Sequence, residues 1–220
     1  MKTKKVLKIV GIVLLVILVI LVIALIYTFR NYKIISKLQA EAENYTNKQN
    51  YHIKSVTSTN DYTIKIDYYQ KGNKQVCFME REINGTKAKI SMYNNGERID
   101  TFTETEDAKK VKLNSAKIME YSVYNVLKTD SNWQTFVYSF LARVKSVNYN
   151  NKECYSISNY LSPYYLDISE KNEIYIEKDT GLMLKQISKS KTNIREYEFD
   201  NVEDSIFAEP DISQYTLQED

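Results

Sequence analysis

Hydrophobic residues follow three successive patterns along the chain, and the first is an unbroken apolar run. Residues 9–29 contain mostly Leu, Ile and Val and no charged residue. As a helix rising about 1.5 Å per residue, the run would be about 30 Å long, the thickness of a hydrocarbon core. A core helix of a soluble domain is the alternative, but such helices rarely run this far without a polar face. The pattern therefore predicts a transmembrane helix over residues 9–29.

The charges beside this run predict its orientation. Lys2, Lys4, Lys5 and Lys8 precede it with no acidic residue among them. The positive-inside rule then places residues 1–8 in the cytoplasm as a basic tail. A cleaved signal peptide would begin in the same way, but its apolar region is usually about 7–15 residues long and is followed by small residues. We expect an uncleaved signal-anchor, and hence a single-pass cell-membrane protein with an extracytoplasmic domain.

The second pattern has the period of an amphipathic helix. Between residues 30 and 50, apolar side chains recur at spacings of three and four, with Lys and Glu between them: Ile34, Ile35, Leu38, Ala42 and Tyr45. This spacing predicts a juxtamembrane helix whose apolar stripe packs against the domain that follows.

The third pattern alternates with a period of two and begins at Tyr51. Asn84-Gly85 and Asn94-Asn95-Gly96 lie between such stretches and are typical of tight hairpin turns. The predicted strands cover residues 62–69, 75–83, 88–92, 98–105, 109–113, 146–149, 153–160, 164–168, 173–178, 182–188 and 193–199. We assign residues 51–215 to one extracytoplasmic domain and residues 216–220 to an acidic tail.

Two further helices are predicted between the two groups of strands. A short one begins near Ser115 and carries Met119, Val123, Val126 and Leu127. Asp130 or Ser131 caps a second helix, whose apolar positions follow the helical period: Trp133, Phe136, Val137, Phe140, Leu141 and Val144. The element order predicts an α+β fold, in which a large curved antiparallel sheet, or half-open β-barrel, is covered on one face by helices. The aromatic stripe has two interpretations: core packing against the sheet, or the lining of a cavity for an apolar ligand.

Two C-terminal segments resemble the LolA/LolB-like family of lipoprotein carriers. They are YIEKDTGLMLKQI, residues 175–187, and EYEFDNVEDSIFAEPDISQY, residues 196–215. The resemblance implies a half-open antiparallel barrel, capped by helices, with a hydrophobic cavity for acyl chains. This chain departs from the carriers because it carries a predicted membrane anchor. The resemblance therefore implies a fixed role in lipid handling or sensing rather than shuttling.

The stripe and the resemblance together give a set of candidate residues for a lipid or another hydrophobic ligand. They are Trp133, Phe136, Val137, Phe140, Leu141, Ile64, Ile66 and Tyr68. The alternative function is that of a non-enzymatic envelope scaffold or sensor, in which the same fold docks a protein partner. The expected partners are thus the lipid bilayer and, in addition, either a lipid or acyl ligand or an envelope protein.

Charge and composition argue against other function classes. Beyond residue 30 the chain carries 25 basic and 28 acidic residues, so it lacks the basic surface that nucleic-acid binding needs. His52 is the only histidine, and no phosphate loop, HExxH pair or CxxC pair is present. We therefore expect no enzyme, no cofactor and no metal site. Cys77 and Cys154 each lie in a predicted strand; one disulfide and two buried thiols are both open interpretations.

Overall fold

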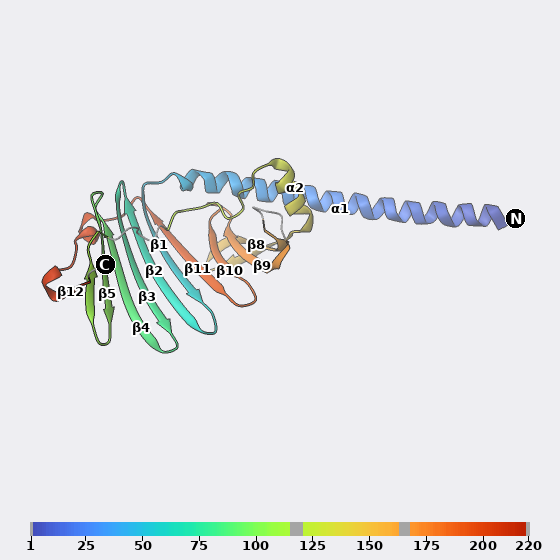
Figure 1. Cartoon of the computed structure of the whole chain (residues 1–220). Coiled ribbons are helices and arrows are strands. Elements are labelled where there is room, and N and C mark those ends of the chain that lie inside the picture. Colours follow the sequence, from blue (N-terminus) through green and yellow to red (C-terminus); the bar gives the residue numbers. More distant parts are fainter. Residues whose placement is uncertain (1, 115–120, 163–167, 219–220) are drawn as a thin grey trace.

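The structure, a computed structural model, describes residues 2–114, 121–162 and 168–218. These residues form two α-helices and one twelve-stranded sheet (Figure 1). The helices are α1 (Lys2–Thr46) and α2 (Asn132–Leu141). The strands are β1 (Asn50–Ser58), β2 (Tyr62–Lys71), β3 (Lys74–Ile83), β4 (Thr86–Asn94), β5 (Ile99–Thr105), β6 (Lys109–Lys112), β7 (Arg143–Tyr149), β8 (Lys152–Leu161), β9 (Ile168–Glu177), β10 (Met183–Ile187), β11 (Thr192–Phe199) and β12 (Thr216–Leu217). Two short 3-10 helices, η1 (Asp204–Phe207) and η2 (Ile212–Gln214), precede β12.

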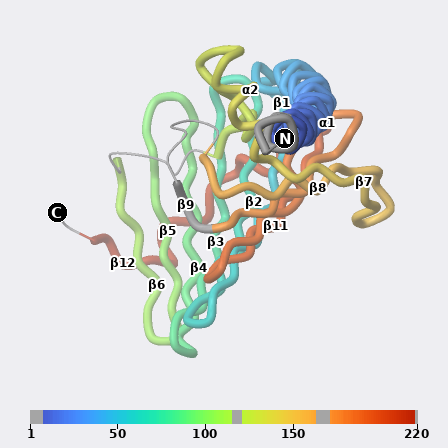
Figure 2. Tube along the Cα trace, turned by 90° about the vertical axis from the view of Figure 1, so that its right-hand side faces the viewer, coloured from blue at the N-terminus to red at the C-terminus, as the bar shows by residue number. Residues whose placement is uncertain are grey.

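The sheet is open and almost entirely antiparallel. Its strand order is β12-β6-β5-β4-β3-β2-β1-β11-β10-β9-β8-β7, and only the short pairing of β12 with β6 is parallel. Figure 2 shows its curvature with α1 seen nearly end-on. The predicted Asn84-Gly85 turn joins β3 to β4, with positive φ angles of 49° and 81° at its two residues. The predicted α+β fold with a large antiparallel sheet is confirmed; the sheet does not close into a barrel.

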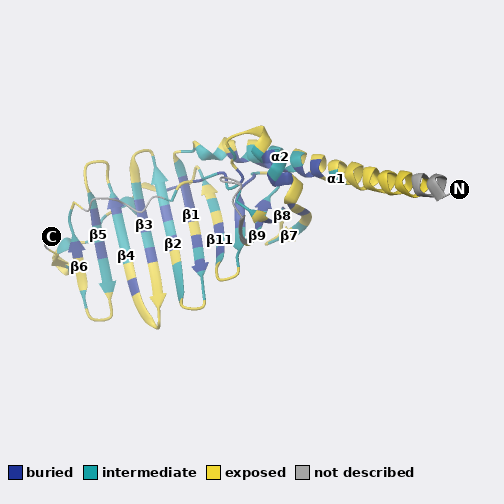
Figure 3. Ribbon diagram, turned by 45° about the vertical axis from the view of Figure 1, so that its right-hand side comes forward, coloured by how far each residue is buried: buried dark blue, intermediate teal, exposed yellow. Residues whose placement is uncertain are grey.

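Helix α1 has two parts with opposite environments. Side chains from Ile9 to Ile23 are all exposed, whereas Ile35, Leu38 and Ala42 are buried against the sheet (Figure 3). Ile35 and Leu38 join a core with residues of β7 to β10, and Ala42 joins a second core with residues of β1 to β3. The helix predicted over residues 30–50 is thus present as the packed part of α1, and its apolar stripe faces the sheet.

Helix α1 packs closely on the turn between β9 and β10, at Gly181. Its φ is +67°, and a Cβ there would overlap the carbonyl of Leu38 and lie 2.7 Å from the amide nitrogen of Ala42. Only glycine tolerates both that backbone conformation and that contact. The Asp179-Thr180-Gly181 turn therefore lies directly against the backbone of α1.

The two faces of the sheet are covered by different segments. We call the face that packs on α1 the inner face; its core includes Ile53, Ile66 and Tyr68. On the opposite, outer face, Val76, Tyr93, Phe102 and Val111 pack with residues of the C-terminal segment, namely Phe207, Ile212 and Tyr215. Both faces are therefore apolar in part.

One predicted helix is absent where the structure can test it. Residues 115–120 lie outside the described residues, and Tyr121 to Leu127 form no helix. Asn125 explains the difference, because its side-chain oxygen accepts from the amide of Leu127 at 3.1 Å and its Nδ2 donates to the carbonyl of Gln39 at 2.9 Å. Such side-chain bonds to the backbone compete with the helix. Residues 164–167 of another predicted strand also lie outside the described residues.

Candidate functional site

Helix α2 is placed by hydrogen bonds to its polar side. Ser131 caps it as predicted, with Oγ accepting from the amide of Gln134 at 3.2 Å. Asn31 of α1 donates from Nδ2 to the carbonyls of Ser139, at 3.2 Å, and Ala142, at 2.8 Å. The buried side chains of α2 are Thr135, Tyr138 and Ser139. Two of these three are small hydroxyl residues, so the helix turns a largely polar side toward the protein.

The aromatic stripe of α2 consequently faces outward. Trp133, Phe140 and Leu141 are 68%, 52% and 53% exposed, so neither predicted role, core packing on the sheet or lining an internal cavity, holds for these three. Phe136 and Val137 are half-buried, and the Phe136 ring lies edge-on to Phe29 of α1 at 5.7 Å. The helix ends before Val144, which is a buried residue of β7.

The candidates from the sheet lie elsewhere, on the inner face. Ile66 and Tyr68 are buried in the core beneath α1, and Ile64 is half-buried at its margin. Strand register continues this apolar surface across the sheet, because Ile66 pairs with Met79 and Met79 pairs with Ile90. The eight predicted residues are therefore divided between two surfaces, an inner one on the sheet and an outward one on α2.

Arg195 of β11 is a residue of the inner face that sequence reasoning missed as a site residue. It is only 8% exposed, and its Nε is buried without a hydrogen-bond partner among the described residues. Its guanidinium carbon lies 4.6 Å from the ring centre of Tyr124 and 5.8 Å from that of Tyr121. The described residues show no ion pair to it. Arg195 is thus a buried cation that is held by aromatic faces and by a side-chain hydrogen bond to Tyr197.

The neighbouring tyrosines respond to the same burial. Burial raises the pKa of Tyr197 and of Tyr121, and the positive charge of Arg195 acts on both in the opposite direction. The alternation of residues along β11 could have predicted that Arg195 lies on the inner face. Arg195 has the same parity as Asn193 and Tyr197, so it points to the inner face, where a lone arginine is uncommon.

The residues considered for catalysis or redox chemistry are engaged in structural contacts. His52 lies on the outer face with Nε2 2.9 Å from Asp67 and Nδ1 3.3 Å from Glu198, and it stacks on Tyr69. Both ring nitrogens therefore have carboxylate partners. Cys77 and Cys154 are free, buried thiols, and burial raises the pKa of Cys77 to about 12. The described residues contain no group of three or more metal-ligating side chains.

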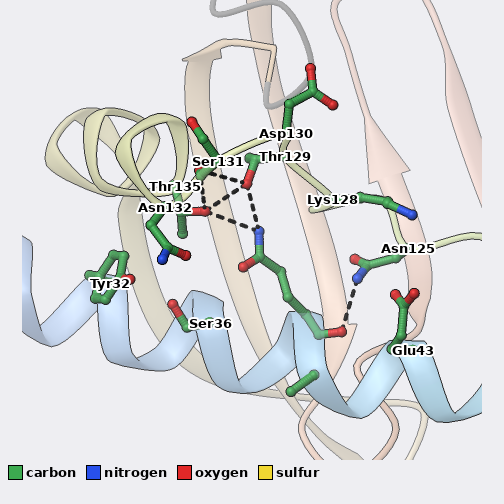
Figure 4. Close-up of a pocket in the computed structure, with 12 residues that line it drawn as sticks. Tyr32, Ser36, Glu43, Asn125, Lys128, Thr129, Asp130, Ser131, Asn132 and Thr135 are labelled. Atoms are coloured by element: carbon green, nitrogen blue, oxygen red, sulfur yellow. Dashed lines mark hydrogen bonds between the residues drawn. The ribbon is translucent and has the colours of Figure 1, made fainter.

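A polar pocket of about 460 Å³ lies between α1 and the segment that leads into α2 (Figure 4). Gln39 reaches across it and donates to the carbonyl of Leu127 at 2.6 Å, while the hydroxyls of Thr129 and Thr135 are 2.6 Å apart. None of the eight predicted ligand residues lines this pocket. Its lining consists of Tyr32, Ser36, Gln39, Ala40, Glu43, Asn125, Lys128, Thr129, Asp130, Ser131, Asn132 and Thr135.

Comparison with solved structures finds similarity at a low level. The crystal structure of MucB aligns with 80% of this chain at 9% identity and a TM-score of 0.34. MucB in complex with MucA(peri) aligns with 80% at 10% identity and a TM-score of 0.33. A DUF1329 family protein from Desulfovibrio piger aligns over 83% of this chain and 97% of its own, at 14% identity and a TM-score of 0.29.

These similarities are too weak to transfer a ligand or a partner from the solved structures to this chain. The alignments cover 62% and 57% of the two MucB chains, so this chain matches about three-fifths of their length. With every TM-score below 0.5, they carry no argument about ligand or partner. No family model and no curated protein matches the sequence. The site must therefore be interpreted from its own residues.

Chemically, the inner face combines an apolar strip with one buried positive charge. A ligand that complements both has a hydrocarbon part and an anionic group. The polar pocket beside α1 offers amide and hydroxyl groups instead and suits hydration or a small polar group.

Proposed function

We propose that the chain is a membrane-anchored, non-enzymatic domain of the LolA/LolB-like type that binds a lipid or fatty acid at the outer face of the cell membrane. The anchor is the exposed apolar part of α1, which is long and apolar enough to cross a bilayer. The lysines at its N-terminal end favour a cytoplasmic N-terminus. The ligand surface is the inner face, and the group that carries the proposal is Arg195.

Arg195 supports an anionic ligand on energetic grounds. Removing a charge from water costs several kcal/mol unless a partner compensates, and here the described compensation is two aromatic faces and a side-chain hydrogen bond to the Tyr197 hydroxyl, with no carboxylate among the described residues. A carboxylate or phosphate would add charge-assisted, bidentate hydrogen bonds, for which the guanidinium is suited. The apolar strip begins two strands away at Ile64, and its half-buried members Ile64 and Ile90 are the surface that we propose for a hydrocarbon chain.

The experiment is fatty-acid binding by the full-length protein in detergent, measured with a fluorescent fatty acid and by native mass spectrometry. Arg195→Met keeps an unbranched side chain, about two atoms shorter than arginine, and removes its charge. We expect affinity to fall by a factor of about 10 or more, because hydrogen bonds to charged groups contribute about 1.5–3 kcal/mol. The matched control is Lys54→Met, since Lys54 is an exposed cation on the opposite face of neighbouring β1.

Two outcomes would count against the proposal. If the wild-type protein is repeatedly isolated without lipid and binds no fatty acid, the inner face is not a lipid site. If Arg195→Met binds as well as Lys54→Met while both remain folded by circular dichroism, the charge has no role in binding. Crosslinking in membranes that recovers one protein partner through the inner face would favour the scaffold function instead.

A further inference from the structure

The outward face of α2 is an apolar surface next to the end of the apolar part of α1. Its exposed members are Trp133, Phe140 and Leu141, and Phe29 of α1 is 53% exposed beside them. Phe136 connects the two helices, since its ring stacks on Trp133 at 5.9 Å and contacts Phe29 at 5.7 Å. A contiguous group of exposed aromatic and aliphatic side chains requires an apolar environment to cover it.

Hydrogen bonds place this face at a defined level along α1. Gln39 bonds to the segment before α2, and Asn31 bonds to the carbonyls of Ser139 and Ala142 at its C-terminal end. Residues 31 and 39 are about 12 Å apart along a helix. Helix α2 therefore runs back along α1 toward the apolar segment, and its last residues, Phe140 and Leu141, come level with Asn31. The apolar run ends only two residues earlier, at Phe29.

Basic side chains lie at the same level. Arg30 and Lys33 are exposed on α1, and exposed Arg143 directly follows the Ala142 carbonyl that Asn31 binds. Among the described residues, these three cations form no ion pair. Headgroup phosphates lie at this depth when the apolar run spans the hydrocarbon core, and they attract arginine and lysine.

We propose that the outward face of α2 lies in the outer-leaflet interface of the same bilayer that α1 crosses. Trp133, Phe140 and Leu141 then contact the boundary between acyl chains and headgroups, the depth at which tryptophan is enriched in membrane proteins. This inference rests on the membrane anchor of the proposed function. The contact between α2 and the bilayer would hold the domain against the membrane surface. It would also keep the inner face close to the lipid that this face is proposed to bind.

Trp133 is the only tryptophan of the chain, so its fluorescence reports on this face alone. The full-length protein is placed in nanodiscs of phosphatidylcholine and phosphatidylglycerol, with and without bromine atoms on the acyl chains. We expect a blue-shifted emission that brominated lipid quenches strongly and aqueous acrylamide quenches weakly. Efficient acrylamide quenching without bromolipid quenching would overturn the proposal. Protection from both quenchers, as in a contact between two copies, would also overturn it.

Variants separate this surface from general effects on the fold. The double change Phe140→Ser and Leu141→Ser should shift Trp133 emission to the red and reduce its bromolipid quenching. The control Leu217→Ser removes an equally exposed leucine at the far edge of the sheet and should leave both readouts unchanged. Retention in the membrane after alkaline extraction tests the anchor independently. A protein that is retained but shows a water-exposed Trp133 would refute only the α2 contact.

Discussion

The two helices carry similar apolar stripes and place them in opposite environments. In the packed part of α1, Leu38 is 1% exposed and lies in the core against the sheet. In α2, Leu141 is 53% exposed, and the buried side is formed by Thr135, Tyr138 and Ser139. Helical periodicity shows that a helix has an apolar side. It does not show whether protein or lipid covers that side.

The reason for the difference lies in what each helix meets. Helix α1 approaches the sheet so closely that glycine is required at position 181, and its small and aliphatic residues fill the interface. Helix α2 meets α1 beside Asn31 and Gln39, which supply hydrogen-bond donors. Satisfying those donors turns Thr135 and Ser139 inward and leaves the aromatic residues outside.

The largest effect is expected for Leu38→Ala, which tests the packed side of the comparison. Truncation of a buried leucine leaves a cavity and costs roughly 2–5 kcal/mol of unfolding free energy. Denaturant unfolding of the full-length protein in detergent, followed by circular dichroism, measures the change. A loss below about 1 kcal/mol would show that α1 does not form part of the core, since measured costs at such sites start near 2 kcal/mol.

Gly181→Ala should be nearly as damaging. The new Cβ would overlap the backbone of α1 and would also strain a residue at positive φ, with a combined cost of roughly 2–4 kcal/mol. Gly72→Ala is the matched control, because its φ is +61° and no atom lies within 4 Å of the added Cβ. It should cost about 1 kcal/mol from strain alone. Equal losses of unfolding free energy in the two variants would mean that α1 does not pack directly on Gly181.

Sequence reasoning predicted the elements well and the environments less well. The hairpin between β3 and β4 could be predicted because Asn84 and Gly85 both adopt positive φ angles, which few other residues favour. The burial of the apolar stripe of α1 was predictable because a long aliphatic helix face next to a sheet is buried most simply by packing on that sheet. The orientation of α2 depends on Asn31, about one hundred residues away in sequence, and no local pattern reveals that partner. Arg195 became a site residue only when the fold brought Tyr121 and Tyr124 over it.

Asn31→Ala tests the bond that orients α2. The change leaves the carbonyls of Ser139 and Ala142 without their donor, at a cost of roughly 1–3 kcal/mol. The lower part of this range is favoured because Asn31 Oδ1 is itself buried and has no hydrogen-bond partner in the part of the chain that the structure describes. Trp133 emission in detergent should also change, since Phe136 and Phe29 would separate. Asn148→Ala, at an exposed asparagine of β7, should change neither stability nor emission.

The smallest effect is expected for Leu141→Ala, which is chemically the same change as Leu38→Ala. Its side chain is half exposed at the end of α2, so the unfolding free energy in detergent should change by at most about 0.5 kcal/mol. Comparing the two variants therefore shows the effect of the environment alone, because the same atoms are removed from a leucine in each of two helices of one domain. A cost for Leu141→Ala that approaches that of Leu38→Ala would place the stripe of α2 against protein. The contrast between the two helices, and the membrane contact inferred from it, would then both be wrong.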